Sequence, residues 1–279
     1  MILVIGATGT IGTQLVDQLT QADYSVRAFT RNPERAAKFG GKVEVAIGNL
    51  DDEKSLLQAM RGVQRCFLIT RSTQQDKNAL VAAKEAGVGH VVKISTQEAG
   101  WTPVQGHGHW HREREELIRA SGLTWTFLRP SMYMSFALSW VQSLRAENAI
   151  YSAGGPGKLG PVDPWDVAAV AKAALTISEH ENVAYELTGP ELLSFGEMAA
   201  TLSKVTGRPI RHVDISDTEQ GEIFSKMGLP KYTVDGLVET FSLIRNGRFA
   251  YLTEDVEKVT ATRPRTFETW VQENIAAFL

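Results

Sequence analysis

Apolar and polar positions alternate in two different rhythms along the first 130 residues. Ile2 to Ile5 form a continuous apolar run, which is typical of a buried strand, and the apolar residues from Ile11 to Leu19 follow the three-to-four spacing of a helix. The same alternation repeats, and it is typical of a parallel sheet with helices on both faces. We predict strands at 2–5, 24–30, 43–47, 64–70, 90–95 and 124–128, and helices at 10–22, 32–39, 75–86 and 107–120. Asp51 or Asp52 is expected to cap a further helix, which contains Leu56, Leu57, Ala59 and Met60.

The pattern changes after Pro130. Residues 131–147 indicate an apolar helix, residues 163–178 a further helix, and residues 184–188 a seventh strand that rejoins the sheet. We therefore expect an α/β fold, a Rossmann-type doubly wound parallel sheet with a small, mostly helical C-terminal lobe. Residues 1–130, with 160–190 rejoining them, are expected to form the sheet domain. Residues 131–159 and 191–279 form the interleaved substrate-binding lobe.

Composition excludes several classes of protein. The 279 residues are 43% hydrophobic and 22% charged, as in ordinary globular proteins, and the formal net charge of −3 gives no basic excess for nucleic acid. No apolar run approaches the roughly 20 residues of a membrane helix. The first strand begins at Ile2 and leaves no room for a signal peptide, so we expect a cytoplasmic protein. Cys66 is expected to be a buried core residue.

The strongest candidate site is a glycine-rich turn between the first strand and the first helix. In this setting, Gly6 would form the tight turn, Gly9 would let a pyrophosphate approach the backbone, and Gly12 would let the helix pack against the strand. The N–H groups at the start of the helix would hold the phosphates. We expect the following residues to bind a dinucleotide: Gly6, Thr8, Gly9, Thr10, Ile11 and Gly12.

The end of the second strand indicates which dinucleotide binds. A site for NAD usually has Asp or Glu here, to hold the ribose hydroxyls. This chain has Arg31 instead, with Arg35 one helical turn later. A guanidinium group suits a phosphate, and we therefore expect NADP(H) as the cofactor, although two solvated surface arginines are the alternative.

Other strand ends should lie at the same edge of the sheet, where ligands of such folds bind. Asn49 and Leu50 would flank the adenine, and Thr70, Arg71 and Ser72 would lie along the bridging ribose. Each of these assignments competes with ordinary loop chemistry.

Taken together, the motifs resemble one family. The chain is similar to the NmrA-like branch of the atypical short-chain dehydrogenase/reductases, which includes NADPH-dependent quinone reductases, triphenylmethane dye reductases, isoflavone-type reductases and catalytically silent redox sensors. The resemblance implies a Rossmann fold with a small C-terminal lobe, and it adds Pro130 to the cofactor site. The motifs that carry it are 6–12, Thr30-Arg31-Asn32-Pro33, 48–52, His111-Arg112-Glu113-Arg114-Glu115, Ser121-Gly122-Leu123, Leu128-Arg129-Pro130 and Leu187-Thr188-Gly189-Pro190.

The chain departs from the wider superfamily at its catalytic pair. That superfamily uses Tyr-x-x-x-Lys on the helix after the fifth strand, whereas here His107 and His111 fall at those positions. His111 resembles histidines that hold the nicotinamide ribose or supply a proton, with Glu115 one turn later to orient it. We name His111, His107 and Ser95 as catalytic candidates, with His111 and Ser95 also beside the cofactor. A packing or solvent-exposed role is the alternative for the histidines, and we expect no metal because no Cys or carboxylate cluster supports one.

Aromatic residues indicate a flat, aromatic substrate, because ligand pockets are mostly apolar. The alternative is that they seal the boundary between the lobes. The candidate pocket residues are Trp101, Trp110, Tyr133, Phe136, Trp140 and Trp165.

Two functions remain. The first is an NADPH-dependent reductase that transfers a hydride to an electron-poor aromatic or quinone-like small molecule. The second is a catalytically silent NAD(P)-binding sensor that acts on a protein partner. The absence of Tyr-x-x-x-Lys disfavours an epimerase or dehydratase. We expect no nucleic-acid or membrane partner, and a homodimer is the expected assembly if the chain associates.

Overall fold

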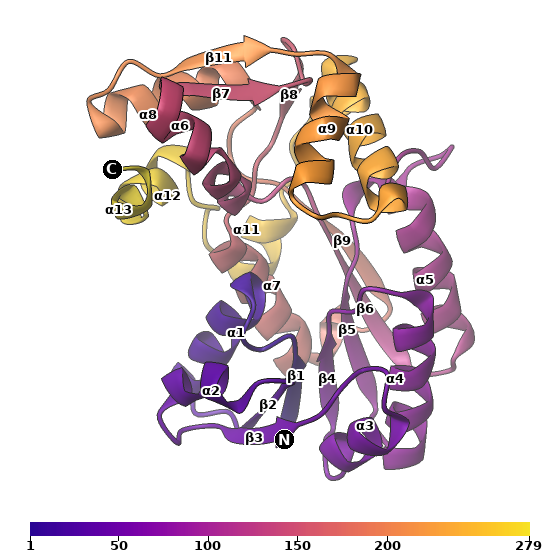
Figure 1. Ribbon diagram of the computed structural model, residues 1–279. Coiled ribbons are helices and arrows are strands. Elements are labelled where there is room, and N and C mark those ends of the chain that lie inside the picture. The colour runs from indigo at the N-terminus through magenta and orange to yellow at the C-terminus, as the bar shows by residue number, and fades with distance from the viewer. The chain divides into compact units, whose positions relative to one another are not determined.

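The chain forms two compact units in its computed structural model, which describes residues 1–279. Unit 1 comprises Met1–Ser95, Trp110–Arg129 and Pro164–Tyr185, and unit 2 comprises Thr96–His109, Pro130–Asp163 and Glu186–Leu279. Each unit therefore collects segments that are far apart in the sequence (Figure 1).

The centre of unit 1 is the sheet. Its strand order is β3-β2-β1-β4-β5-β6-β9, and the neighbours from β3 to β6 run parallel. The order 3-2-1-4-5-6 is that of dinucleotide-binding folds, so the expected Rossmann-type sheet is confirmed. The strands are β1 (Ile2–Ile5), β2 (Val26–Thr30), β3 (Glu44–Ile47), β4 (Arg65–Leu68), β5 (His90–Ile94), β6 (Thr124–Pro130) and β9 (Val183–Leu187).

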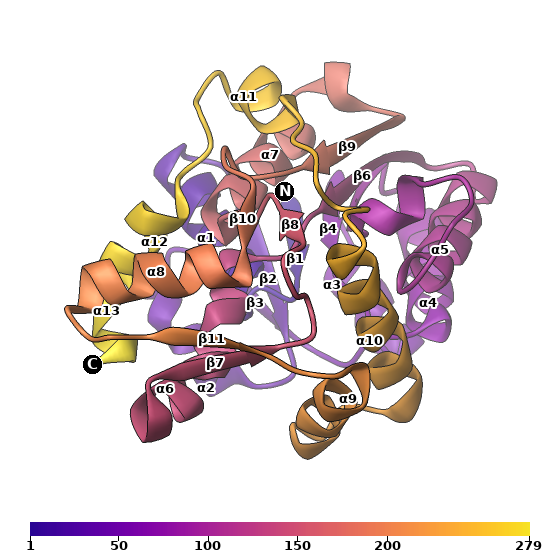
Figure 2. The same cartoon turned by 90° about the horizontal axis from the view of Figure 1, so that it is seen from above.

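Helices cover both faces of this sheet (Figures 1 and 2). On one face lie α1 (Thr10–Gln21) and α7 (Pro164–Thr176), and on the other α3 (Glu53–Met60), α4 (Thr73–Ala86) and α5 (Gly108–Ala120). Local sequence explains where they begin and end. Asp52 and Ser72 cap α3 and α4, and Gly87 ends α4 in the left-handed conformation. The short α2 (Pro33–Ala36) has Asn32 as its cap.

Unit 2 is built from helices around two small strand pairs. The strand β7 (Ala149–Ser152) pairs in parallel with β11 (Arg211–Asp214), and β8 (Lys158–Leu159) pairs antiparallel with β10 (Leu193–Ser194). Its core is aromatic: Phe195 and Phe241 stack with their ring centres 5.3 Å apart. The helices are α6 (Val141–Glu147), α8 (Phe195–Thr206), α9 (Asp217–Lys226), α10 (Lys231–Arg245), α11 (Asp255–Thr260), α12 (Phe267–Glu273) and α13 (Ile275–Phe278).

The expected continuous helix at 131–147 is wrong. The chain first bridges to a distant segment, where the N–H of Met134 donates to the carbonyl of Val162 at 2.9 Å. A 3₁₀ helix (Met134–Trp140) then precedes α6. The first residues of the segment bond to Val162 and not to one another, and the apolar composition of the segment does not predict this pairing. Shorter 3₁₀ turns occur at Ala37–Phe39, Gln97–Gly100 and Ser178–His180.

Candidate active site

The glycine-rich turn has the geometry that a phosphate requires. Gly6 adopts a φ of +81°, and the N–H of Gly9 donates to the carbonyl of Gly6 at 2.9 Å. Gly9 is the N-cap residue of α1, and no side chain caps the helix or places an acid in its first turn. The first N–H groups of α1 and the positive end of its dipole are thus available to an anion.

Two glycines keep this turn open. A Cβ atom on Gly12 would overlap the carbonyl oxygen of Gly6, so α1 can approach the end of β1 this closely only without a side chain there. A Cβ atom on Gly9 would lie 3.2 Å from the same oxygen and would stand at the exposed start of the helix. The cradle fits the pyrophosphate of a dinucleotide.

Basic side chains follow β2, where a 2′-phosphate is expected. Arg31 and Arg35 are exposed, and Arg31 makes no hydrogen bond or ion pair within the chain. Lys38, which the sequence analysis missed, donates from Nζ to Thr13 Oγ1 at 2.6 Å. This bond ties the segment after α2 to the first turn of α1. Lys38 lies three residues after Arg35, a spacing that could have drawn attention to it.

The residue that follows β3, Gly48, packs closely against the ring of Phe29. A Cβ atom on Gly48 would lie 2.6 Å from the ring of Phe29, so the chain passes directly over that ring. The next residues, Asn49 and Leu50, lie at the carboxyl end of the sheet as expected. The side chain of Asn78 donates to the carbonyl of Leu50 at 3.0 Å and fixes the loop.

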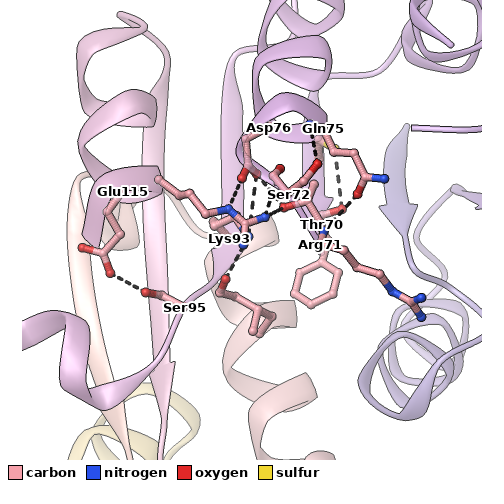
Figure 3. A network of polar contacts seen from close by, with 12 residues as sticks. Thr70, Arg71, Ser72, Gln75, Asp76, Lys93, Ser95 and Glu115 are labelled. Carbon is pink, nitrogen blue, oxygen red and sulfur yellow. Dashed lines mark hydrogen bonds and ion pairs between the residues drawn. The ribbon is translucent and has the colours of Figure 1, made fainter. Parts of the chain in front are cut away.

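A buried network of charges lies behind the end of β4 (Figure 3). Thr70 Oγ1 donates to Asp76 Oδ1 at 2.6 Å, Arg114 contacts both residues, and Lys93 Nζ lies 3.8 Å from Asp76 Oδ1. The Thr70 hydroxyl is thus bonded inside the fold, which leaves its backbone for the predicted ribose contact. Asp76, Lys93 and Arg114 were missed, because no sequence motif joins residues so far apart.

The same network holds two other predicted residues in place. The Ser72 hydroxyl caps α4 by accepting from the N–H of Gln75, whose side chain accepts from the N–H of Arg71. The side chain of Arg71 is exposed. Burial lowers the pKa of Lys93 to about 8, although nearby Asp76 favours its charged form.

Ser95 and Glu115 form a second buried pair in unit 1. The Ser95 hydroxyl donates to Glu115 Oε1 at 2.6 Å, and Arg129 donates to both carboxylate oxygens at 2.9 and 2.6 Å. Arg119 contacts Oε2 at 3.1 Å. Burial alone would raise the pKa of Glu115, but the bonds from Arg129 and Ser95 hold it below its usual value. The partners of Glu115 given by these bonds are Ser95, Arg119 and Arg129, whereas the sequence analysis expected Glu115 to orient His111.

The two candidate histidines occupy different settings. His111 lies on α5 in unit 1, half-buried, with its ring edge-on to Trp110 at 5.1 Å. His107 lies in unit 2, in a turn before α5, because Gly106 takes a φ of +57° and the helix begins at Gly108. The helix predicted to begin at His107 therefore begins one residue later. A Cβ atom on Gly236 would lie 3.2 Å from His107 Nδ1, so α10 passes close to this histidine.

The predicted pocket residues divide between the units. Trp110 and Trp165 belong to unit 1, where the guanidinium of Arg114 lies 4.2 Å from the centre of the Trp110 ring. The other four belong to unit 2. Trp101 and Trp140 are buried in the core, so their burial gives no support to a substrate contact, whereas Tyr133 and Phe136 are half-buried. Pro130, the last residue of β6, is buried in unit 2.

The sequence analysis also missed Glu98, in the segment that follows β5. Its side chain is 2% exposed and bonds to the hydroxyls of Thr96 and Thr240. Burial raises the pKa of this carboxyl above its usual value. Its partner Thr240 is more than one hundred residues away along the chain, so no local signal could have found the pair.

Known proteins resemble this chain along its whole length. An NAD(P)H azoreductase of Xenophilus azovorans is 36% identical, and the match covers 100% of this chain and 99% of that protein. A (4-alkanoyl-5-oxo-2,5-dihydrofuran-3-yl)methyl phosphate reductase of Streptomyces griseus is also 36% identical, with the same coverage. The crystal structure of an Escherichia coli NADPH-dependent quinone oxidoreductase with NADPH superimposes with a TM-score of 0.88 at 26% identity, covering 99% of this chain and 100% of that one.

None of the helices combines the length and apolarity that a membrane crossing requires. Residues 6–178 match the model of a family described as NAD(P)H-binding, a range that begins at the glycine-rich turn and includes Arg31, Ser95 and His111. The resemblance and the cofactor class inferred from the sequence are confirmed. The chain belongs to the NAD(P)H-binding family.

Proposed function

We propose that the protein is an NADPH-dependent reductase of an electron-poor aromatic or quinone-like small molecule. The observation that carries this proposal is the open glycine-rich turn at the start of α1. At the start of α5 and in the turn before it, the chain has histidines in place of the Tyr–Lys pair. An electron-poor acceptor takes a hydride with little help from an acid, so it tolerates the loss of that tyrosine. The relatives act, by their names, on azo compounds, a conjugated furanone and quinones, which share an electron-poor π bond.

The residues of unit 1 have separate roles in holding the cofactor, which supplies a hydride when bound. The backbone of Gly6 to Gly12 binds the pyrophosphate, and Arg31 binds the 2′-phosphate with help from Arg35 and Lys38. Asn49 and Leu50 flank the adenine, and the backbone of Thr70 to Ser72 lies along the bridging ribose.

The nicotinamide end involves the residues at and after the ends of β5 and β6. His111 holds the ribose or supplies a proton, and Ser95 is positioned by its bond to Glu115. Pro130 belongs to the same site by the family resemblance. The substrate-binding part is unit 2, where Tyr133 and Phe136 are the predicted pocket residues that are half-buried and not fully buried.

The sensor function is the weaker alternative, because the relatives that match the whole chain are named as reductases. The cytoplasmic location and the homodimer stay predictions.

Two measurements test the proposal. NADPH consumption is followed against a panel of quinones and azo compounds, and we expect at least one to be reduced; if none is, the reductase assignment fails. Calorimetric titration of Arg31→Ala should show NADPH binding weakened by about 1.5–3 kcal/mol, since a charge-assisted bond is lost, and NADH binding nearly unchanged. Arg61→Ala removes another exposed arginine of unit 1 and is the control. Equal weakening of both cofactors would contradict the role of Arg31.

A further inference from the structure

A buried arginine of α5, Arg114, holds the loop between β4 and α4 from behind. Its side chain is 1% exposed, and its guanidinium group donates from Nε to Asp76 Oδ2 and from Nη2 to the hydroxyl of Thr70. Nη2 also donates to the carbonyl oxygen of Ser72 at 3.4 Å. One rigid group therefore bonds to both ends of the segment from Thr70 to Ser72 and to the helix that follows it.

The helix is anchored through Asp76, which lies in the first turn of α4 and is 0% exposed. Its Oδ1 accepts from Thr70 Oγ1 at 2.6 Å and lies 3.8 Å from Lys93 Nζ of β5 (Figure 3). The Thr70 hydroxyl thus accepts from Arg114 and donates to Asp76. Because a buried charge that loses its counter-charge is costly, the network opposes any displacement of the helix from Arg114.

Two other side chains of α4 connect the helix with neighbouring loops. Gln75 Oε1 accepts from the N–H of Arg71 at 2.9 Å, and its Nε2 donates to Asp51 Oδ1 at 3.1 Å. The side chain of Asn78 donates to the carbonyl of Leu50 at 3.0 Å. The beginning of α4 is therefore bonded both to the loop after β4 and to the loop after β3. The placement of both loops depends on where this helix is held.

The segment that Arg114 holds leaves the sheet beside the glycine-rich turn. A Cβ atom on Gly6 would lie 3.4 Å from the Cβ atom of Ile69, which directly precedes Thr70. The same turn leads into α1, whose first N–H groups are available to an anion. Gly6, residues 69–72 and Arg114 all belong to unit 1. The backbone that Arg114 holds is thus close to the proposed phosphate site.

We propose that Arg114 is a positioning residue for the dinucleotide, because its fork holds the backbone of Thr70 to Ser72 in the shape that binds the ribose. This inference rests on the proposed function, which assigns that ribose contact to this backbone. Arg114 is buried and acts through its bonds to the loop and to Asp76. A lysine cannot replace it, because an ammonium group is a point charge and lacks the planar fork that reaches the carboxylate and the loop together.

The hold on the loop can be measured without cofactor. Backbone hydrogen exchange, followed by mass spectrometry, should be faster at residues 70–78 of Arg114→Lys than in the parent by on the order of 10-fold, because local opening breaks fewer bonds. Equal exchange in these two proteins would overturn the proposal, whether or not the protein is a reductase.

A matched control lies at the other end of the same strand. Arg65, the first residue of β4, is also in unit 1 and donates to Glu181 Oε1 at 2.9 Å. Arg65→Lys therefore disturbs an arginine–carboxylate bond far along β4 from the loop, and it should leave exchange at residues 70–78 unchanged. Faster exchange there in both variants would mean that Arg114 has no special hold on the loop and would overturn the proposal.

Calorimetric titration with NADPH tests the connection with the cofactor. Arg114→Lys should raise the Kd about tenfold, which corresponds to the loss of about 1.4 kcal/mol of binding, whereas Arg65→Lys should leave it unchanged. If Arg114→Lys does not fold, Thr70→Val removes the hydroxyl that joins Arg114 to the loop and should weaken NADPH binding in the same direction. Thr70→Ser returns a hydroxyl and should bind NADPH more tightly than Thr70→Val.

Steady-state kinetics with a quinone separates positioning of the cofactor from a general loss of structure. Arg114→Lys should raise KM for NADPH and change kcat little, because the lost binding is common to the ground state and the transition state. A fall in kcat with an unchanged KM, or equal weakening of NADPH binding in Arg114→Lys and Arg65→Lys, would overturn the proposal. A parent protein that binds no NADPH would instead overturn the proposed function itself.

Discussion

Each unit of the molecule buries one glutamate, and the two are held in opposite ways. Glu115, in unit 1, is 1% exposed and accepts hydrogen bonds from Arg129, Arg119 and Ser95. Glu98, in unit 2, is 2% exposed and has two threonines. The pKa of Glu115 is lowered by its arginines, while that of Glu98 is raised by burial.

The difference teaches that burial by itself does not assign a role to a carboxyl group. Both residues are almost completely buried, so their partners decide in which direction each pKa moves. The partners of Glu115 favour its ionised form, which holds Ser95 and Arg129, whereas burial of Glu98 favours its protonated form.

The largest expected effect is on folding stability. Glu115→Gln leaves Arg129 without its counter-charge, and breaking a buried ion pair costs roughly 3–5 kcal/mol. Glu98 is bonded to two hydroxyls and not to an arginine, so Glu98→Gln breaks no ion pair and should cost less than about 1 kcal/mol. Urea denaturation of both variants measures the two values. If they cost the same, the comparison between the two glutamates fails.

Burial also shifts the pKa of a basic side chain, that of His90 in unit 1. His90 is 1% exposed between the hydroxyls of Thr124 and Thr126, and burial, with Arg65 nearby, lowers its pKa from 6.5 to about 4. The native state keeps it neutral while the unfolded chain takes up a proton, so its contribution to stability is lost as pH falls from 6.5 to about 4. We expect this loss to reach about 3 kcal/mol.

The test for His90 is the free energy of unfolding of the parent and of His90→Gln, measured across this pH range. The difference between the two proteins should change with pH. A constant difference would show that His90 titrates normally.

The smallest expected effect is on the pH dependence of the free energy of unfolding, to which the two glutamates should contribute in opposite directions. The native pKa of Glu115 lies below its unfolded value, so its contribution is present above that value and is lost as pH falls through the native pKa. The native pKa of Glu98 lies above the ordinary 4.5, so its contribution is present below 4.5 and is lost as pH rises through the native pKa. Stability curves of Glu115→Gln and Glu98→Gln against pH should therefore deviate from the parent in opposite directions. Deviations in the same direction would contradict the assigned protonation states.

The sequence could predict those features of the fold and site that depend on residues close together in the chain. The turn from Gly6 to Gly12 was found because its glycines, its strand and its helix are consecutive, and each cap residue lies next to its helix. Arg31 could be proposed for the 2′-phosphate because its position is fixed by the end of β2, and that role stays a prediction. In these places the sequence contains both the group and its partner.

What the sequence could not predict depends on distant partners. Asp76 meets Arg114 and Glu98 meets Thr240 only after the chain has folded. The pairing of β7 with β11 joins segments about sixty residues apart, neither of which has a long apolar run. The helix expected at 131–147 failed for the same reason, since Val162 takes the first hydrogen bonds of that segment.

The way the chain is divided between the units has a consequence for how such proteins diversify. The backbone passes from one unit to the other after Ser95, His109, Arg129, Asp163 and Tyr185. No single genetic crossover can therefore exchange unit 2 while it keeps unit 1. An exchange of the whole of unit 2 takes the replacement of three separate stretches at once, whereas point substitutions within it leave unit 1 untouched. For the same reason, an engineer who wants a different acceptor should redesign side chains and not graft a terminal fragment.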